Sequence, residues 1–147
     1  MAVKNNTWLI LEKRAQRRVA SAMADVLKAG ESVTGLEGSE ARMNQLISEY
    51  RSKLAAVESG THSIGDNMNC RRYIAHIEEV KERLNASLVA AREKLAAAKY
   101  AHRMLEAERA KMAGLADRAK TAEERGRALR DQKGLDSLAI ARFNLAR

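Results

Sequence analysis

The stretch that decides the fold runs from Ala15 to Val57 and reads AQRRVASAMADVLKAGESVTGLEGSEARMNQLISEYRSKLAAV. Steps of four and three residues, taken alternately from Ala15, meet an apolar side chain everywhere except at Glu40. The series is Ala15, Val19, Ala22, Val26, Ala29, Val33, Leu36, Glu40, Met43, Ile47, Tyr50, Leu54 and Val57. A 3.5-residue repeat held over so many heptads keeps one narrow stripe facing a partner helix, as a coiled-coil seam requires. The pattern predicts a helix over about residues 5–58.

Three glycines between Gly30 and Gly38 interrupt the middle of this predicted helix. Each one costs about 1 kcal/mol relative to alanine in a helix interior. One interpretation is a locally loose helix that the seam holds together, and the other is a break or kink near residues 34–39. The first is favoured, because Val33, Leu36 and Met43 stay in the heptad frame.

The small, polar and glycine-rich segment 59–67 is typical of a loop. Gly60 suits the position just after the first helix, and Ser63, Asp66 or Asn67 suits the cap of a second helix. This segment predicts a hairpin turn between two antiparallel helices.

A second helix is predicted over about residues 68–141. Its apolar series is Tyr73, Ile77, Val80, Leu84, Leu88, Ala91, Leu95, Ala98, Leu105, Met112, Leu115, Ala119, Ala122 and Leu129. The two successive steps of four that end at Leu88 indicate a stutter, which is a local unwinding of the supercoil. The fold class expected is therefore all-α, a long antiparallel two-helix coiled coil that forms one hairpin over residues 1–147.

The last segment, residues 125–147, extends beyond the length that the first helix can cover. It carries apolar residues with no partner helix inside the chain: Leu129, Leu135, Leu138, Ile140, Phe143 and Leu145. Unpaired apolar positions on an exposed helix indicate either a binding segment or fraying. We favour binding.

The composition excludes a thick, multi-layer core and indicates acidic partners. Proline is absent, aromatics make up 3% of residues, and the formal net charge is +8. A basic balance favours nucleic acid, an anionic membrane face or an acidic protein surface, without choosing among them. The single Cys70 fits a reducing compartment, and no signal or membrane-spanning stretch is found. A soluble, cytoplasmic protein is expected.

The residues that usually carry chemistry do not form a catalytic, cofactor or metal site. None of His62, His76 and His102 has a glutamate three residues before it, as a helical carboxylate metal site needs. The pattern from Gly60 to Gly65 lacks the lysine of a phosphate-binding loop. Cys70 precedes two arginines that could lower its pKa, but no triad partner is placed for it, so a structural cysteine is favoured. We predict no enzyme and no cofactor.

Basic residues gather in two clusters, one early in the first helix and one in the last segment. They are Lys13, Arg14, Arg17 and Arg18, and then Arg125, Arg127, Arg130, Lys133, Arg142 and Arg147. A hairpin brings both clusters toward the same end. This end either meets an acidic partner or is a solvated helical surface.

Three short segments are similar to elements of the FliJ/YscO family, the coiled-coil stalk proteins of flagellar and virulence type III secretion systems. Residues 49–54, EYRSKL, resemble the family's Tyr-Arg element late in the first helix. Residues 72–78, RYIAHIE, resemble the aromatic-Ile element that opens the second helix, and residues 131–139, DQKGLDSLA, resemble the family's ending. The chain departs from the family in the strongly basic start of its first helix.

The resemblance implies a non-enzymatic component of a protein export apparatus. Such a stalk binds the hexameric export ATPase, promotes its assembly, couples it to the membrane export gate and handles export chaperones. Its location would be cytoplasmic, peripheral to the inner-membrane export apparatus, with no direct membrane insertion. The implied ATPase contacts are Arg14, Arg17, Arg18, Leu135 and Leu138. The implied contacts with the cytoplasmic domain of the gate protein are Met43, Leu46, Tyr50, Tyr73, Ile77, Val80 and Leu84, most of which seam packing also explains.

Two other classes of function stay open. A nucleic-acid-binding helical protein is supported by net charge alone, since no helix-turn-helix appears and few aromatics are present to stack on bases. A generic structural coiled coil that forms oligomers is the other class. Neither has a motif in its favour, so no specific nucleic-acid partner is expected.

Overall fold

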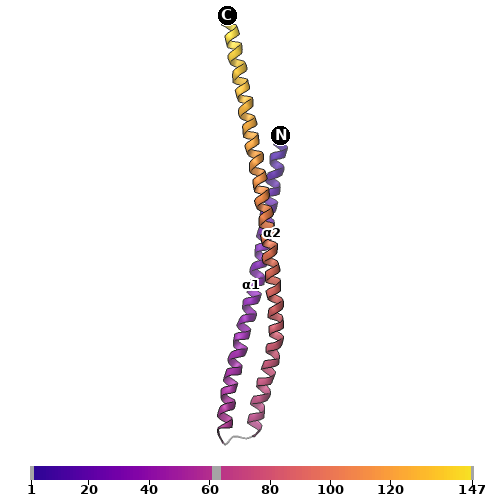
Figure 1. Cartoon of the computed structure of the whole chain (residues 1–147), viewed down its shortest axis with the longest axis vertical. Helices are drawn as coiled ribbons and strands as arrows, with labels where there is room; N and C mark the ends of the chain where they lie inside the picture. The colour runs from indigo at the N-terminus through magenta and orange to yellow at the C-terminus, as the bar shows by residue number, and fades with distance from the viewer. Residues whose placement is uncertain (1, 61–63, 147) are drawn as a thin grey trace. The chain divides into compact units, whose positions relative to one another are not determined.

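The structure, a computed structural model, describes residues 2–60 and 64–146, with side chains from residue 7 onward. Its regular elements within these ranges are two α-helices, α1 spanning Ala2–Glu58 and α2 spanning Ile64–Leu145 (Figure 1). The predicted fold class, an all-α antiparallel two-helix hairpin, is confirmed.

The junction between the helices differs from the prediction in its details. Asp66 and Asn67, expected to precede α2, lie in its first turn, and Ser63 falls outside the described residues. Gly60, two residues after the end of α1, does not have a positive φ. Instead its N–H donates to the carbonyl of Val57 at 3.4 Å, an i→i+3 bond that tightens the last turn. α2 therefore begins closer to the turn than the glycine-rich composition indicated, whereas α1 ends at Glu58.

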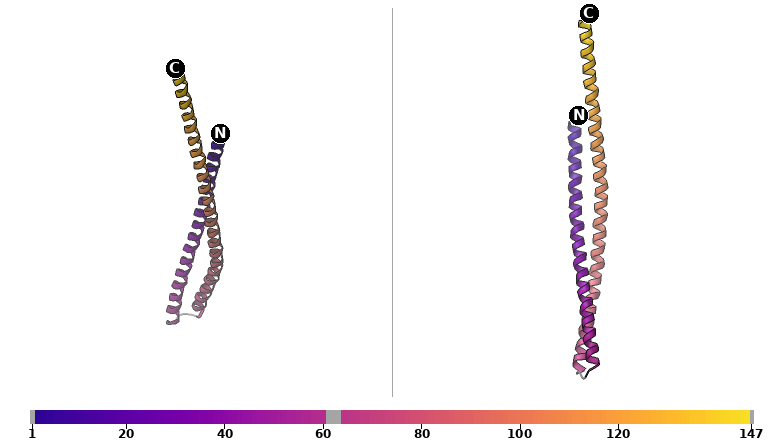
Figure 2. Two further views of the ribbon diagram at one scale, coloured as in Figure 1. Left: turned by 45° about the horizontal axis from the view of Figure 1, so that its top comes forward. Right: turned by 90° about the vertical axis from the view of Figure 1, so that its left-hand side faces the viewer.

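The backbone contacts group into two compact units rather than one. Unit 1 combines Met1–Ser21 with His102–Arg147, and unit 2 is Ala22–Ala101. Each unit pairs a segment of α1 with a segment of α2, and Figure 2 shows the pairing within each from two further directions.

The seam of unit 2 confirms the heptad frame of α1 and corrects that of α2. The buried side chains of α1 in this unit are Ala22, Val33 and Ile47, all in the predicted series. On α2, Ile74 is buried whereas Tyr73 is 38% exposed. The seam of α2 therefore runs Cys70, Ile74, Ile77, Lys81, Leu84, Leu88, Ala91, Leu95 and Ala98, each of them buried or half-buried. These steps alternate regularly between four and three, so the predicted stutter is wrong.

The glycine-rich stretch of α1 is helical without interruption. Two hydroxyls donate to carbonyls one turn earlier: Thr34 Oγ1 to Gly30 at 3.0 Å, and Ser39 Oγ to Gly35 at 3.2 Å. Such bonds to the i−4 carbonyl often bend a helix slightly but do not break it. The structure therefore supports a helix that the seam holds together, rather than a break near residues 34–39.

One side of the unit 2 seam carries ion pairs between the helices. We call this side the ion-pair flank. Its pairs are Glu37–Arg92 at 3.3 Å, Arg51–Glu78 at 3.0 Å and Glu58–Arg71 at 2.6 Å. Each of these residues directly follows a seam residue, which places all three pairs along the same edge. The repeated complementarity supports one antiparallel register over another.

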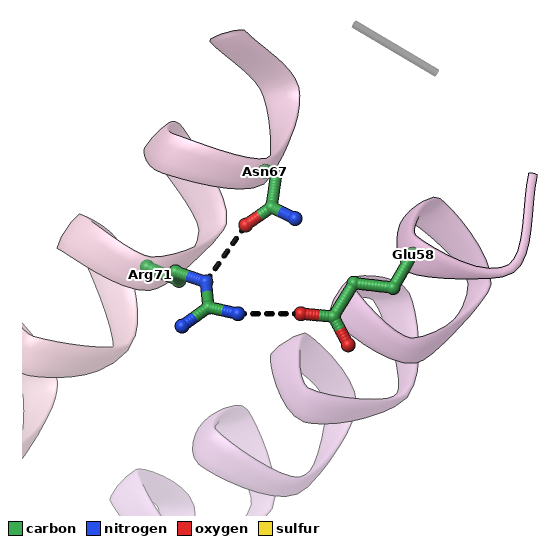
Figure 3. Close-up of polar contacts among 3 residues, drawn as sticks. All are labelled: Glu58, Asn67 and Arg71. Atoms are coloured by element: carbon green, nitrogen blue, oxygen red, sulfur yellow. Dashed lines mark hydrogen bonds and ion pairs between the residues drawn. The ribbon is translucent and has the colours of Figure 1, made fainter. Parts of the chain in front are cut away.

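The pair nearest the turn is part of a small network (Figure 3). The Arg71 guanidinium donates through Nη2 to Glu58 of α1 and through Nε to Asn67 Oδ1 at 2.7 Å on its own helix. The Asn67 contact orients the guanidinium toward α1. This network links the last turn of α1 to the first turns of α2.

The Arg51–Glu78 pair is expected to contribute modestly to stability. Both side chains are at least half exposed, and exposed pairs contribute about 0.2–1 kcal/mol. A double-mutant cycle with Arg51→Ala and Glu78→Ala, read by urea unfolding, should show a coupling within this range that shrinks in high salt. Arg72→Ala with Glu79→Ala, neither of them in a pair between the helices, is the matched control. A coupling no larger than that of the control would mean that the pair does not form in solution.

Unit 1 has a weaker, more polar seam. Ala15 is its buried residue, while Val19, Leu105 and Met112 are half-buried and His102 and Arg109 occupy seam positions of α2. Arg109 donates two hydrogen bonds to Glu106 one turn earlier, and these bonds lower the pKa of the Glu106 carboxyl. Polar side chains at seam positions bury little apolar area, so this unit gains less from packing than unit 2 does.

Candidate partner-binding surfaces

Part of the side of the unit 2 seam opposite the ion-pair flank is apolar and aromatic. Leu46 and Val80 directly precede seam residues of α1 and α2, and Tyr73 directly precedes Ile74. Residues at such positions lie beside the seam, on the edge away from the ion pairs. We call the surface formed by these three residues and the adjoining seam residue Tyr50 the apolar patch.

A pair of stacked tyrosines forms the centre of the apolar patch. The ring centroids of Tyr50 and Tyr73 lie 4.0 Å apart at an interplanar angle of 32°. Lys53 Nζ lies 4.7 Å from the centroid of the Tyr50 ring, which is within the range of a cation–π contact. The lysine was not among the predicted residues, although its position one turn after Tyr50 was the available signal. Large aromatic side chains that remain accessible are typical anchors of protein interfaces.

The predicted gate residues divide into three groups by accessibility. Ile77 is 4% exposed and belongs to the core, so its side chain is not offered to a partner. Met43, Leu46, Tyr50, Val80 and Leu84 are half-buried, and Tyr73 is 38% exposed. Four of the seven, Leu46, Tyr50, Tyr73 and Val80, are the members of the apolar patch. The structure thus brings together residues 49–54 and 72–78, the two segments that resemble family elements. Only some of the apolar side chains in this region are exposed to a partner.

The last segment of α2 is a second accessible surface. Every described residue from 127 to 146, which we call the tail, is exposed. Figures 1 and 2 show this end of α2 continuing past the start of α1. The exposed apolar side chains that it carries are Leu129, Leu135, Leu138, Ile140, Phe143 and Leu145. The tail therefore remains helical with no cover from α1.

The predicted ATPase contacts do not form one cluster. Arg18 lies beside Glu108, with 3.9 Å between Nη1 and Oε1. Glu108 is 27 residues before Leu135 on the same helix, which corresponds to about 40 Å. Arg14 lines a small cleft with Arg18 and Glu108, and Arg17 is exposed. The arginines and the leucines of the prediction are therefore separate surfaces of unit 1, which one small partner domain does not span.

A cleft of about 440 Å³ lies in unit 1 between the start of α1 and residues 113–127 of α2. Its lining residues are Leu9, Glu12, Ala113, Ala116, Asp117, Lys120, Glu123, Glu124 and Arg127. Arg127 already pairs with Glu123 at 2.9 Å. We call this hollow the acidic cleft, since its remaining charges are three carboxylates and one lysine. Sequence reasoning missed it, because Glu12 is far from the other carboxylates along the chain.

The described residues contain no group of three His, Cys, Asp or Glu side chains arranged to hold a metal ion. Among the same residues, no helix is long and apolar enough to cross a membrane.

A protein-family model described as flagellar FliJ protein matches residues 9–147. The chain belongs to the FliJ family. It is therefore a component of the flagellar export apparatus, and its family is not one of enzymes. No significant match was found among curated proteins or among solved structures. The family match includes both units of this FliJ family member, so the apolar patch and the tail are features of one family domain.

Proposed function

We propose that this FliJ family protein is the stalk of the export apparatus. In this role it binds the hexameric export ATPase, promotes assembly of the hexamer, and couples it to the export gate. It also handles export chaperones that have released their cargo. It works in the cytoplasm, beside the inner-membrane export apparatus.

The observation that carries the proposal is the presence of an apolar surface in each unit, fully exposed in the tail and half-buried to exposed in the apolar patch. Coupling two partners requires two separate contacts on one chain. The tail of unit 1 combines leucines with the basic residues Arg130, Lys133 and Arg142, and the apolar patch of unit 2 presents two aromatic rings. The two surfaces share no residue, because they belong to different units. We assign the ATPase to the tail and the gate to the apolar patch.

The ATPase contact is tested by titrating this protein into the export ATPase of the same organism while following ATP hydrolysis and oligomeric state. A saturable rise in rate with hexamer formation is expected. The variant Leu135→Ser/Leu138→Ser should lose most of this stimulation, because both side chains are more than 60% exposed and their loss does not disturb the seam. Leu27→Ser, at an exposed leucine of unit 2, is the matched control. No change in rate or assembly with the unaltered protein would refute the stalk proposal.

The gate contact is tested by the binding of this protein to the cytoplasmic domain of the export gate protein. Tyr73→Ser should weaken binding about tenfold or more, as truncation of an interface aromatic commonly does. Tyr100→Ser is the matched control, since Tyr100 is a tyrosine on the same helix and is 58% exposed. Equal effects of the two variants would exclude the apolar patch as the contact.

A further inference from the structure

The tail carries a heptad stripe whose two halves complement each other. Alternate steps of three and four residues lead from Ala128 to Leu145, and every member of the series is exposed. The members are Ala128, Asp131, Leu135, Leu138, Arg142 and Leu145. An acidic residue stands before the two central leucines, and a basic residue stands after them at the same spacing. Such an arrangement fits an interface that a chain makes with an identical copy of itself.

An antiparallel copy of the stripe meets each member with a compatible side chain. In an antiparallel coiled coil, the first seam position of a heptad on one helix faces the second seam position on the other. The facing residues are then Leu135 with Leu138, Asp131 with Arg142, and Ala128 with Leu145. A two-fold axis makes every contact twice, so two leucine layers lie between two ion pairs. Within the part of the chain that the structure describes, the side chains of Asp131 and Arg142 form no ion pair of their own.

The charges select one orientation and one register of two tails. A parallel pair would place Asp131 against Asp131 and Arg142 against Arg142, so that like charges repel at both positions. A shift of the antiparallel pair by one heptad would place either Arg142 or Asp131 against a leucine. A charged group in that position loses water without gaining a partner. The arrangement centred between the two middle leucines avoids both costs.

The surroundings of the stripe leave room for a second helix. The positions beside it carry small or uncharged residues, Gln132, Gly134, Ala139 and Ala141. The paired span uses the tail alone, which continues past the start of α1 (Figure 1). The α1 helix therefore does not cover the stripe.

We infer that this chain forms an antiparallel dimer through its tail, with the two-fold axis between Leu135 and Leu138. The occupant of the stripe is a second copy, because the stripe itself supplies the complement of its own charges. Pairing covers the leucines that a single tail leaves in water. The span from 128 to 145 is little more than two heptads, so the dimer is weak and dissociates on dilution. It requires neither partner of the proposed function.

Two charge reversals test whether Asp131 faces Arg142 of the second copy. In Asp131→Arg two cations face each other, and in Arg142→Asp two carboxylates do. Each variant alone should dimerise about tenfold or more less tightly than the unaltered protein. The net charge rises in the first variant and falls in the second, so a loss in both does not come from net charge. An equimolar mixture of the two variants should dimerise again, because each supplies the charge that the other needs.

The measurement is sedimentation equilibrium of the full chain at concentrations up to about 1 mM. Physiological salt screens the repulsion between two copies that each carry a net charge of +8. Leu135→Ser/Leu138→Ser should abolish the dimer. Leu129→Ser/Ile140→Ser is the matched control and should leave it unchanged, since these side chains are equally exposed but lie off the stripe. Far-ultraviolet circular dichroism checks that every variant stays helical.

Loss of the dimer in both charge variants, with recovery in their mixture, supports the inference. A monomer at every concentration of the unaltered protein overturns it. Loss in both variants without recovery in the mixture also overturns it, because the two residues then do not face each other. The same holds for a dimer that either charge variant retains at full strength, or that the control abolishes and the leucine variant does not.

Discussion

Replacement of Gly30, Gly35 and Gly38 by alanine is expected to raise the free energy of unfolding by roughly 2–3 kcal/mol. All three lie in the interior of α1, and none has a positive φ. A Cβ added at any of them meets no heavy atom within 4 Å. Alanine therefore adds helix propensity and restricts the unfolded chain, without a steric cost in the folded state.

The measurement is thermal unfolding of the triple variant, followed by far-ultraviolet circular dichroism. The midpoint should rise by about 5 °C or more, since 1 kcal/mol shifts the Tm of a domain of this size by a few degrees. Ala41→Gly, at an exposed position of the same helix, should change stability by about 1 kcal/mol in the opposite direction. An unchanged or lower midpoint for the triple variant would show that this stretch is not continuous helix in solution.

Leu88→Ala is expected to lower the free energy of unfolding by about 2–4 kcal/mol. Leu88 is 3% exposed, the lowest value among the buried apolar residues described for this chain. A seam between two helices has no second layer to close over a missing side chain. Most of the stability lost is therefore not recovered by repacking.

Val89→Ala is the control for this prediction, because the neighbouring valine is 55% exposed. Its effect should stay within about 0.5 kcal/mol. Urea unfolding of both variants gives the comparison, with equal m values showing that the same surface unfolds. If Val89→Ala proved as costly as Leu88→Ala, α2 would be rotated about its axis from the orientation described.

The seam of α2 shows why the heptad pattern alone did not predict which of its residues face α1. Tyr73 and Ile74 are adjacent and both apolar, and the prediction selected the larger side chain. With Tyr73 in the seam, the steps to Leu88 needed a stutter, whereas with Ile74 they are regular. The choice depends on which side chain fits against α1, and the composition of α2 does not contain that information.

The apolar patch was predictable only in part. The resemblance to the FliJ/YscO family indicated that Tyr50 and Tyr73 belong to neighbouring segments, and their rings are stacked at 4.0 Å. The burial of Ile77 was predicted by the seam series, whereas the position of Lys53 beside the Tyr50 ring required the packed structure. The acidic cleft was not predictable, because Glu12 and Asp117 become neighbours only through pairing of the helices.

By itself the sequence determined two long helices, the seam of α1, the turn between the helices and the family. These follow from local periodicity, from the absence of proline and from short family motifs, none of which depends on distant contacts. Tertiary structure alone decided the rotation of α2, the separation of an ion-pair flank from an apolar patch, and the distance between the early arginines and the tail leucines. The physical reason is that a heptad repeat defines one stripe on each helix. The register and rotation of the partner come from the side chains that meet across the seam.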